Sequence, residues 1–363
     1  SLISVLATGR YEMALMQPKE TDEVALLVNL IFKLITIVSI LSFVIILFLD
    51  FTGGITFFIK EQRREWIYFV PFSVFILGSV QAITYLIIRE KKFSLLSDSK
   101  IKISLINASV QLSGGMLLKS FFGLIIGHIL GYLAFCFSVL KSGALSKYFI
   151  SNKDSIKQVA SKYKQYPIYD VPSVLINLAS NQLPILVLAK VFNLSVLGYY
   201  AFTYKVLMLP VGLLSNSVLD VYKQKASEEY MEVGNCKDAY LATLKTLLKV
   251  GLVPFIIIML FAPQLFTYIF GSKWRVSGEY AQIMAPMFFL NFVISPLSYT
   301  LFIAQKQFVN LIGQSILFFL ILVSVTMGVK VNNEYSVVIY FTISYCVVYL
   351  MYLCLSYKYA KGN

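Results

Sequence analysis

Long apolar runs recur along the chain, and they constrain its fold more than any other feature of the sequence. One of them, VALLVNLIFKLITIVSILSFVIILFL (24–49), contains a single charged residue, Lys33. A run of about 20 apolar residues crosses a lipid bilayer as a helix. Hydrophobic residues make up 58% of the chain and charged residues 13%, against roughly 45–50% and 25% in soluble domains. The sequence therefore predicts an all-α polytopic membrane protein.

The apolar runs also predict the number of membrane spans. The chain begins with Ser1, and SLISVLATG (1–9) has the character of the second half of an apolar helix. No basic segment or cleavage site of a signal peptide precedes it. We therefore expect an N-terminally truncated chain, with about ten complete helices from a total of twelve. The expected spans are 24–49, 66–88, 102–118, 120–140, 168–192, 196–221, 241–263, 281–304, 308–329 and 335–357.

A Lys- and Ser-rich stretch, KSGALSKYFISNKDSIKQVASKYKQYP, is the longest connection between spans. It predicts three regions: an incomplete N-terminal bundle (1–140), a linker (141–167) and a C-terminal six-helix bundle (168–363). The end of the linker has a weak amphipathic pattern, but its composition favours a solvated linker over a short helix.

The charge distribution predicts the orientation in the membrane. The chain has 31 Lys and Arg against 18 Asp and Glu, a net charge of +13. In a membrane protein such an excess marks cytoplasmic loops rather than nucleic-acid binding. The basic residues concentrate in the linker and in the other segments on its side of the membrane. We therefore expect a multi-pass membrane protein whose linker and C-terminus are cytoplasmic.

Polar residues line one face of each of two consecutive expected helices. In the first, Asp170, Asn177, Asn181 and Pro184 share a face, and Gln182 lies beside it. Polar side chains inside a span normally face a protein interior or a watery cavity. Hydrogen bonding between helices is an equally good explanation for each amide taken alone.

The second of these helices carries a matching stripe. At 100° per residue, Gly198, Lys205, Gly212 and Asn216 fall on one face, with Asp220 nearby. Two neighbouring polar stripes favour a shared hydrophilic cavity, although the long stem of Lys205 also allows its ammonium group to extend outward to the interface. Proline within a helix removes a hydrogen bond, so Pro184 and Pro210 are expected to break or bend their helices.

The N-terminal bundle has fewer polar positions within its spans. Asn107, Gln111 and Gly114 share a face, and Lys33 lies close enough to the cytoplasm to reach it. The spacing GxxxGxxxG at 123–131 predicts close helix packing. The abundant aromatic residues, 24 Tyr and 29 Phe, fit interfacial belts and lipid-facing packing.

Several classes of chemistry find no support in the sequence. The four cysteines are scattered without a CxxC pair, and there is one histidine. The loops carry no Walker, GxSxG or HExxH motif. We therefore expect no metal, no cofactor and no enzymatic activity.

Three motifs give the chain a family resemblance. The stretch YDVPSVLINLASNQLPILVLAKVFNLSVLGYYAFTYKVLMLPVGLLSNSVLDVY (169–222) resembles the polysaccharide-transporter branch of the MOP flippase superfamily, in its S-x-Q-L-P and G-Y-Y elements. RYEMALMQPKE (10–20) is similar to the segment that follows the second helix in that family. FFGLIIGHILGY (121–132) is similar to its sixth helix. The resemblance covers essentially the whole chain.

The resemblance implies a two-lobe, MOP/MATE-like helical bundle around a cavity that opens alternately to either side. It implies a Wzx-type flippase that moves undecaprenyl-pyrophosphate-linked O-antigen or exopolysaccharide repeat units to the outer leaflet. Its partners would be membrane lipids, a polysaccharide polymerase and a chain-length regulator, with no nucleic acid. The expected pyrophosphate contacts are Lys205 and Lys33; the expected headgroup contacts are Asn177, Asn181, Gln182, Asn216, Asn107 and Gln111; the expected gating or structural residues are Arg10, Glu12, Asp170, Pro184, Pro210 and Asp220.

Two other functions remain open at this point. A multidrug or lipid exporter of the same superfamily would favour a carboxylate in the cavity, and the sequence offers Asp170 and Asp220 near one membrane face. An O-antigen polymerase would need a sizeable outer loop. The longest outer loops expected here, 51–65 and 264–280, are short.

Overall fold

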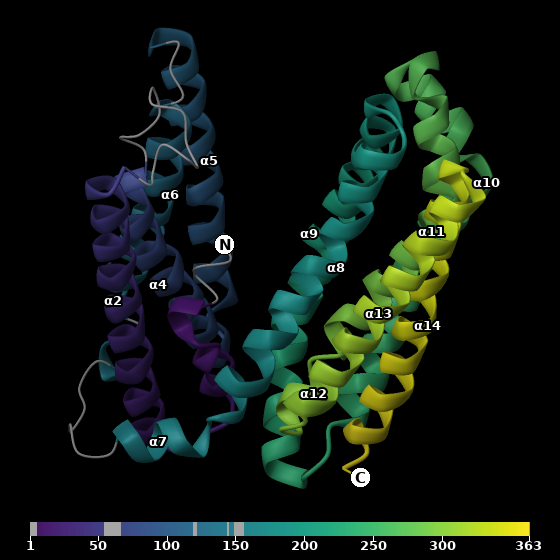
Figure 1. Cartoon of the computed structure of the whole chain (residues 1–363). Helices are drawn as coiled ribbons and strands as arrows, with labels where there is room; N and C mark the ends of the chain where they lie inside the picture. Colours follow the sequence, from purple (N-terminus) through teal and green to yellow (C-terminus); the bar gives the residue numbers. More distant parts are fainter. Residues whose placement is uncertain (1–5, 54–66, 119–121, 144, 149–155, 363) are drawn as a thin grey trace. The chain divides into compact units, whose positions relative to one another are not determined.

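The computed structural model describes residues 6–53, 67–118, 122–143, 145–148 and 156–362, and within these ranges the chain is helical with no strand (Figure 1). The chain divides into two compact units, Ser1–Val171 (unit 1) and Pro172–Asn363 (unit 2). Most of the expected N-terminal remnant (1–9) and of the outer loop at 51–65 lies outside the described residues.

Among its described residues, unit 1 has four long helices, joined in part by short helical turns. Helix α2 illustrates why such a helix needs lipid: its apolar 18-residue window has a mean hydropathy of 2.8, yet 22% of that window is buried within the protein. The elements of unit 1 are η1 (Tyr11–Met16), α2 (Thr21–Phe51), α4 (Val70–Arg89), α5 (Phe93–Leu118), α6 (Phe122–Lys141), η3 (Ser146–Tyr148), α7 (Ile156–Lys162) and η5 (Tyr166–Asp170).

Unit 2 is a bundle around α11. The membrane-spanning segment that contains this helix, Ser272–Ile303, has 67% of its apolar 18-residue window buried. The surrounding helices expose apolar side chains outward, among them Leu213 and Phe319. The elements of unit 2 are α8 (Val171–Val191), α9 (Leu194–Val233), α10 (Lys237–Phe270), η6 (Ser272–Trp274), α11 (Arg275–Leu297), α12 (Thr300–Ile303), α13 (Gln307–Val331) and α14 (Glu334–Ala360). Helix α9 continues well beyond the expected end of its span at residue 221.

Within the described residues, nine helices are long and apolar enough to cross a membrane. They coincide with nine of the ten expected spans. The tenth, expected at 102–118, forms helix α5, which is long enough but not among these nine. Its mean hydropathy is lowered by Lys100, Lys102, Asn107 and Gln111.

Helices α5 and α6 pack through glycine, as the GxxxGxxxG spacing predicted. A Cβ atom added at Gly123 would lie 2.8 Å from the Cα atom of Gly114, and one added at Gly131 would lie 3.0 Å from the carbonyl oxygen of Ile103. No side chain fits at these contacts, so the two backbones touch. The prediction of close packing is confirmed.

The end of the linker is docked on unit 1 rather than solvated, so the preference for a solvated linker was wrong over this part. Residues 156–162 form helix α7, in which Val159 is buried. The Tyr11 hydroxyl donates to the carbonyl oxygen of Ala160 at 3.1 Å, and Tyr163 donates to Glu23 at 3.1 Å. Aromatic and carboxylate groups on η1 and α2 therefore hold this end of the linker.

Candidate functional site

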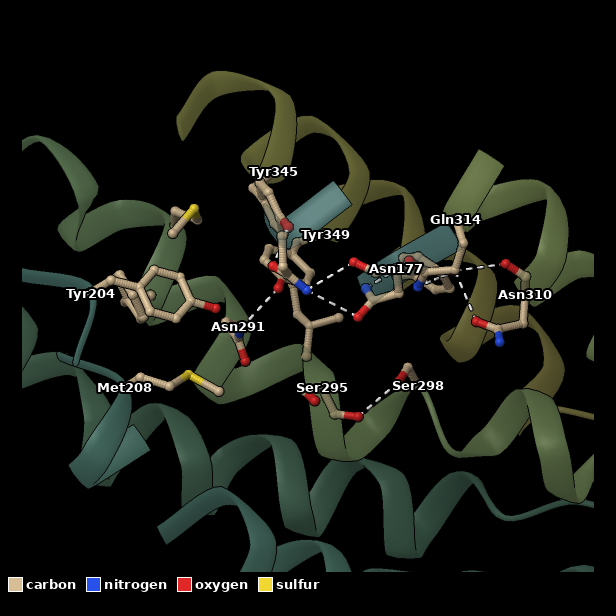
Figure 2. Close-up of a pocket in the computed structure, with 15 residues that line it drawn as sticks. Asn177, Tyr204, Met208, Asn291, Ser295, Ser298, Asn310, Gln314, Tyr345 and Tyr349 are labelled. Atoms are coloured by element: carbon tan, nitrogen blue, oxygen red, sulfur yellow. Dashed lines mark hydrogen bonds between the residues drawn. The ribbon is translucent and has the colours of Figure 1, made fainter. Parts of the chain in front are cut away.

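Five helices of unit 2 enclose a polar cavity of about 240 Å³ (Figure 2). Helices α8, α9, α11, α13 and α14 all contribute side chains, and each belongs to a segment long and apolar enough to span a membrane. The lining residues are Asn177, Asn181, Tyr204, Met208, Met287, Phe288, Asn291, Ile294, Ser295, Ser298, Asn310, Gln314, Tyr345, Tyr349 and Tyr352.

A chain of hydrogen bonds joins three helices at one end of the cavity. The Asn177 amide donates to Gln314 at 2.9 Å, and the Gln314 amide donates to the Tyr352 hydroxyl at 3.1 Å. The Tyr352 hydroxyl in turn donates to Asn310 Oδ1 at 2.9 Å. Burying polar groups within a membrane span is costly unless they are paired, and these side chains pair with one another.

Asn181 extends this network toward the middle of the cavity. Its amide donates to Asn177 Oδ1 at 3.1 Å, one turn away on α8. The Tyr345 hydroxyl on α14 donates to Asn181 Oδ1 at 2.6 Å. The network therefore fixes the orientation of both α8 amides, and their rotamers are set before any ligand binds.

The other end of the cavity has polar groups that the protein does not use (Figure 2). The Tyr204 hydroxyl has no hydrogen-bond partner among the described residues. Asn291 donates to the Tyr349 hydroxyl at 2.8 Å, while its amide oxygen accepts no hydrogen bond within the described part of the chain. If the oxygen and nitrogen of this amide are exchanged, one polar atom still faces the cavity. These groups remain available to a ligand.

The cavity carries no formal charge. All of its lining side chains are amides, hydroxyls, aromatic rings, thioethers or an aliphatic group, with no carboxylate or cation among them. The half-buried ring of Tyr204 and the buried ring of Phe288 form part of its wall, with their centroids 5.5 Å apart. Among the described residues there is also no group of three His, Cys, Asp or Glu side chains that would hold a metal ion. The amides and hydroxyls of the cavity suit hydrogen bonding to a polar ligand.

Two of the eight predicted substrate contacts, Asn177 and Asn181, line the cavity. Lys205, Gln182 and Asn216 also lie in unit 2, but their side chains are exposed and do not line it. The α9 stripe therefore does not share this cavity with the α8 stripe. The roles of these three residues remain predictions.

The other three predicted substrate contacts belong to unit 1. Lys33 is exposed on α2. Gln111 donates to Asn107 Oδ1 at 2.5 Å, and both side chains pack over Gly127 of α6. These amides therefore help to join α5 to α6, and their role in binding a headgroup remains a prediction.

Arg10 and Glu12 form the expected pair, and Asp170 joins them. Arg10 Nη1 lies 3.5 Å from Glu12 Oε1, and Arg10 Nε lies 2.5 Å from Asp170 Oδ2. Both carboxylates are fully buried. The Gln81 amide donates to Glu12 Oε1 at 2.6 Å. Burial raises the pKa of Glu12 above its ordinary value of 4.5, although the charge of Arg10 acts to lower it.

The remaining predicted gating residues lie in unit 2. Asp220 is buried and pairs with Lys223 at 3.5 Å. Pro184 is buried within α8, and Pro210 is exposed within α9. Both helices continue through these prolines, so of the expected break or bend the break does not occur, and the bend remains a prediction.

Most residues that line the cavity were not predicted from the sequence. Asn291, Asn310 and Gln314 are polar residues within expected spans, and the spacing of Asn310 and Gln314 by one helical turn was a usable signal. Tyr345, Tyr349 and Tyr352 repeat at helical spacing on α14, but they were counted with the interfacial aromatic residues. The structure instead assigns them to the wall of the cavity.

Solved membrane transporters share this fold. A mutant of the Vibrio cholerae MATE transporter VcmN aligns with a TM-score of 0.76 at 13% identity, over 98% of this chain and 83% of that chain. A MOP superfamily transporter from Pyrococcus furiosus aligns with a TM-score of 0.68 at 14% identity, over the same shares. The MATE transporter ClbM, solved with Rb⁺, gives 0.67 at 12% identity, also over 98% and 83%. At these low identities the structural alignments establish the fold alone. The chain is a multi-pass membrane protein with the two-lobe fold of MOP and MATE transporters.

The family follows from the sequence match. Residues 1–279 match the family described as polysaccharide biosynthesis protein, and the chain belongs to that family. No match was found among curated proteins. The resemblance to the polysaccharide branch of the MOP superfamily is thereby confirmed, and the chain is a membrane transporter of the polysaccharide biosynthesis class.

Proposed function

We propose that the protein translocates undecaprenyl-pyrophosphate-linked O-antigen or exopolysaccharide repeat units from the cytoplasmic to the outer leaflet of the bacterial inner membrane. The observation that carries this proposal is the uncharged polar cavity enclosed by membrane-spanning helices of unit 2. Membership of the polysaccharide biosynthesis family and the transporter fold support the same reading.

The physical task is to carry a polar headgroup past hydrocarbon. A saccharide with a pyrophosphate cannot enter the bilayer core unaided, because loss of water costs each unpaired hydroxyl several kcal/mol and each charge far more. A protein cavity that supplies amides and hydroxyls replaces this water, while the polyprenyl tail stays in lipid. Alternating access of the cavity to the two sides then completes the transfer.

The pyrophosphate needs cations, and the cavity of unit 2 has none. Lys205 and Lys33 are exposed on α9 and α2, each within a membrane-spanning segment. We assign them to the pyrophosphate, because an ammonium group within a membrane-spanning segment can offset its negative charge. In this proposal the C-terminus and the linker are cytoplasmic, because basic residues concentrate on that side of the membrane. A polymerase and a chain-length regulator then act on the translocated unit.

The competing exporter function is less well supported by the same cavity. A carrier of cationic drugs needs a negative charge at its binding site to compensate the cation. The carboxylates considered for this role, Asp170 and Asp220, are both buried in ion pairs and do not line the cavity.

The test is deletion of the gene in its host, with measurement of lipid-linked intermediates and surface polysaccharide. The proposal predicts loss of surface polymer, with single repeat units retained on undecaprenyl pyrophosphate in the cytoplasmic leaflet and rescue by the intact gene. Single units that reach the outer leaflet without polymerising would identify a polymerase. Unchanged glycan together with raised drug sensitivity would identify an exporter.

A further inference from the structure

The cavity in unit 2 is polarised in its hydrogen bonding, although it has no charge. At the α13 end, Asn310 and Gln314 are held in the internal network. At the α9 end, the Tyr204 hydroxyl and the amide oxygen of Asn291 have no protein partner among the described residues. Tyr204 and Asn291 are half-buried and line the cavity, so both polar groups are open to a molecule inside it. Two such groups facing one space point to a ligand that supplies both donors and acceptors.

The chemistry of these groups selects the class of ligand. A phenolic hydroxyl donates and accepts, and a carboxamide oxygen accepts. The neighbouring wall is apolar: Phe288 and Met287 are buried, and Met208 lies one turn after Tyr204 on α9. A sugar ring has the complementary character, because its hydroxyl groups lie around its edge and its C–H groups form apolar faces.

The size of the cavity limits the ligand to a single ring. Sites for drug-sized ligands enclose roughly 300–1,000 Å³, and this cavity encloses about 240 Å³. Ser295 lines the cavity and is exposed, so the space opens to the surface of unit 2 beside that residue. The rest of an oligosaccharide would extend through this opening.

The absence of charge excludes ionic ligands on energetic grounds. A carboxylate or phosphate buried here would have no cation among the lining side chains to pair with, and a buried unpaired charge is strongly disfavoured. A metal cation would likewise find no carboxylate among the lining residues. Lys205 follows Tyr204 directly in sequence, but its side chain is exposed elsewhere on α9.

We propose that this cavity is a subsite for one uncharged saccharide ring, which hydrogen-bonds to Tyr204 and Asn291 and packs on Phe288. The inference rests on the proposed function, because the ring would be one residue of the lipid-linked unit. It adds a rule of specificity: a neutral hexose or N-acetylhexosamine enters this subsite, and a uronic acid or a phosphorylated sugar does not.

Saturation-transfer difference NMR on the purified full chain in nanodiscs tests the subsite. The probes are methyl glucoside, N-acetylglucosamine, glucuronate and glucose 6-phosphate. We expect signals from at least one of the two neutral sugars and none from the two anionic sugars. Tyr204→Phe should weaken the neutral-sugar affinity by about fivefold or more, the effect of one lost hydrogen bond.

Tyr200→Phe is the matched control, because it makes the same change one turn earlier on the same helix. The Tyr200 hydroxyl is buried, has no partner among the described residues and does not line the cavity. Neither variant removes a protein hydrogen bond, so both should keep the thermal stability of the wild type. Equal sugar affinity in the wild type and Tyr204→Phe would overturn the proposal, as would absence of any neutral-sugar signal.

Asn291→Asp separates a sugar site from a cation site. A new carboxylate should weaken neutral-sugar binding, since it would have to be buried beside the ligand. A cation site would give a different pattern: NaCl would raise the unfolding midpoint of the wild type more than choline chloride does, and Asn291→Asp would increase this difference. That pattern, together with the absence of any sugar signal, would overturn the proposal.

Complementation of the deletion strain distinguishes failure of the subsite from failure of the proposed function. We expect Tyr204→Phe to restore less surface polymer than Tyr200→Phe at equal protein level. If the deletion causes no retention of lipid-linked units, the translocation proposal fails whether or not sugar binds. If the deletion causes retention of lipid-linked units and the two variants complement equally, the subsite alone is overturned.

Discussion

Arg10 donates a hydrogen bond from Nε to Oδ2 of Asp170 at 2.5 Å, across 160 residues of sequence. The pair ties η1, near the start of the chain, to η5, which ends directly before helix α8 of unit 2. The last turn before unit 2 is therefore held on unit 1 by a buried charge.

Replacing Arg10 by Ala should strongly destabilise unit 1. The change leaves Asp170 and Glu12 buried without their cation, and breaking a buried ion pair in this way costs roughly 3–5 kcal/mol. Arg10 also has a φ of 61°, in the left-handed region. Arg10→Gly should therefore be less harmful than Arg10→Ala, because glycine adopts this conformation freely. Thermal unfolding of the purified protein measures both, and an Arg10→Ala variant with the wild-type midpoint would contradict the ion-pair account.

Glu12 gives unit 1 a dependence on pH. Because burial raises its pKa above 4.5 in the folded protein, its contribution to stability is fully present at pH values below the ordinary pKa. This contribution is lost as the pH rises through the raised value. Glu12→Gln should remove this dependence and keep the contact with Gln81, whereas Glu12→Ala should lose that contact. The test is the unfolding midpoint of each variant, measured from acidic to neutral pH. If the midpoints of the wild type and Glu12→Gln change with pH in parallel, Glu12 is not the source of the pH dependence.

The glycine contact between α5 and α6 predicts a matched pair of substitutions. Gly123→Ala places a methyl group 2.8 Å from the Cα atom of Gly114, and overpacking of this kind costs about 1–3 kcal/mol. Gly115→Ala meets nothing within 4 Å, and in a helix it should be neutral or stabilising by up to about 1 kcal/mol. Thermal stability in the same nanodiscs compares them. Equal effects of the two changes would show that the close approach is unimportant.

Lys205 tests the assignment of the pyrophosphate. Lys205→Ala should reduce transport about tenfold or more, as expected for loss of one hydrogen bond to a charged group. Lys205→Arg should retain much of the activity, because it keeps the charge. Lys190→Ala, at an exposed lysine on α8, serves as the control. Surface polymer in the complemented deletion strain is the readout, and full complementation by Lys205→Ala would remove this residue from the binding site.

Hydropathy was sufficient to predict most of the helices, because lipid demands apolar outer surfaces and leaves little choice of structure. The helix expected at 102–118 is present as α5, although polar side chains such as Asn107 and Gln111, which lie against α6, lower its hydropathy. Spacing on a helix was sufficient to predict that Gly123 and Gly131 allow close packing. Hydropathy and helical spacing are local properties of the chain, so they can be read from a single sequence.

Long-range contacts were beyond the reach of the sequence. The linker was expected to be solvated, and its composition gave no sign that Tyr11 and Glu23 would bind it. In the cavity, the α8 stripe identified Asn177 and Asn181, because both lie on one face of one helix. Their partners Gln314 and Tyr345 come from α13 and α14, and nothing in the periodicity of α8 shows which helix lies opposite.

The most direct test of the translocation account uses the purified protein and its own substrate. Lipid-linked saccharide extracted from the deletion strain is incorporated into liposomes with the full chain, and a membrane-impermeant oxidant measures the fraction of headgroups exposed outside. Protein-free liposomes should leave about half of the headgroups protected for hours, because spontaneous transfer is slow. Liposomes with the protein should lose this protection within minutes, and Tyr204→Phe should slow the loss. Protection that is equal with and without the protein would contradict the central claim.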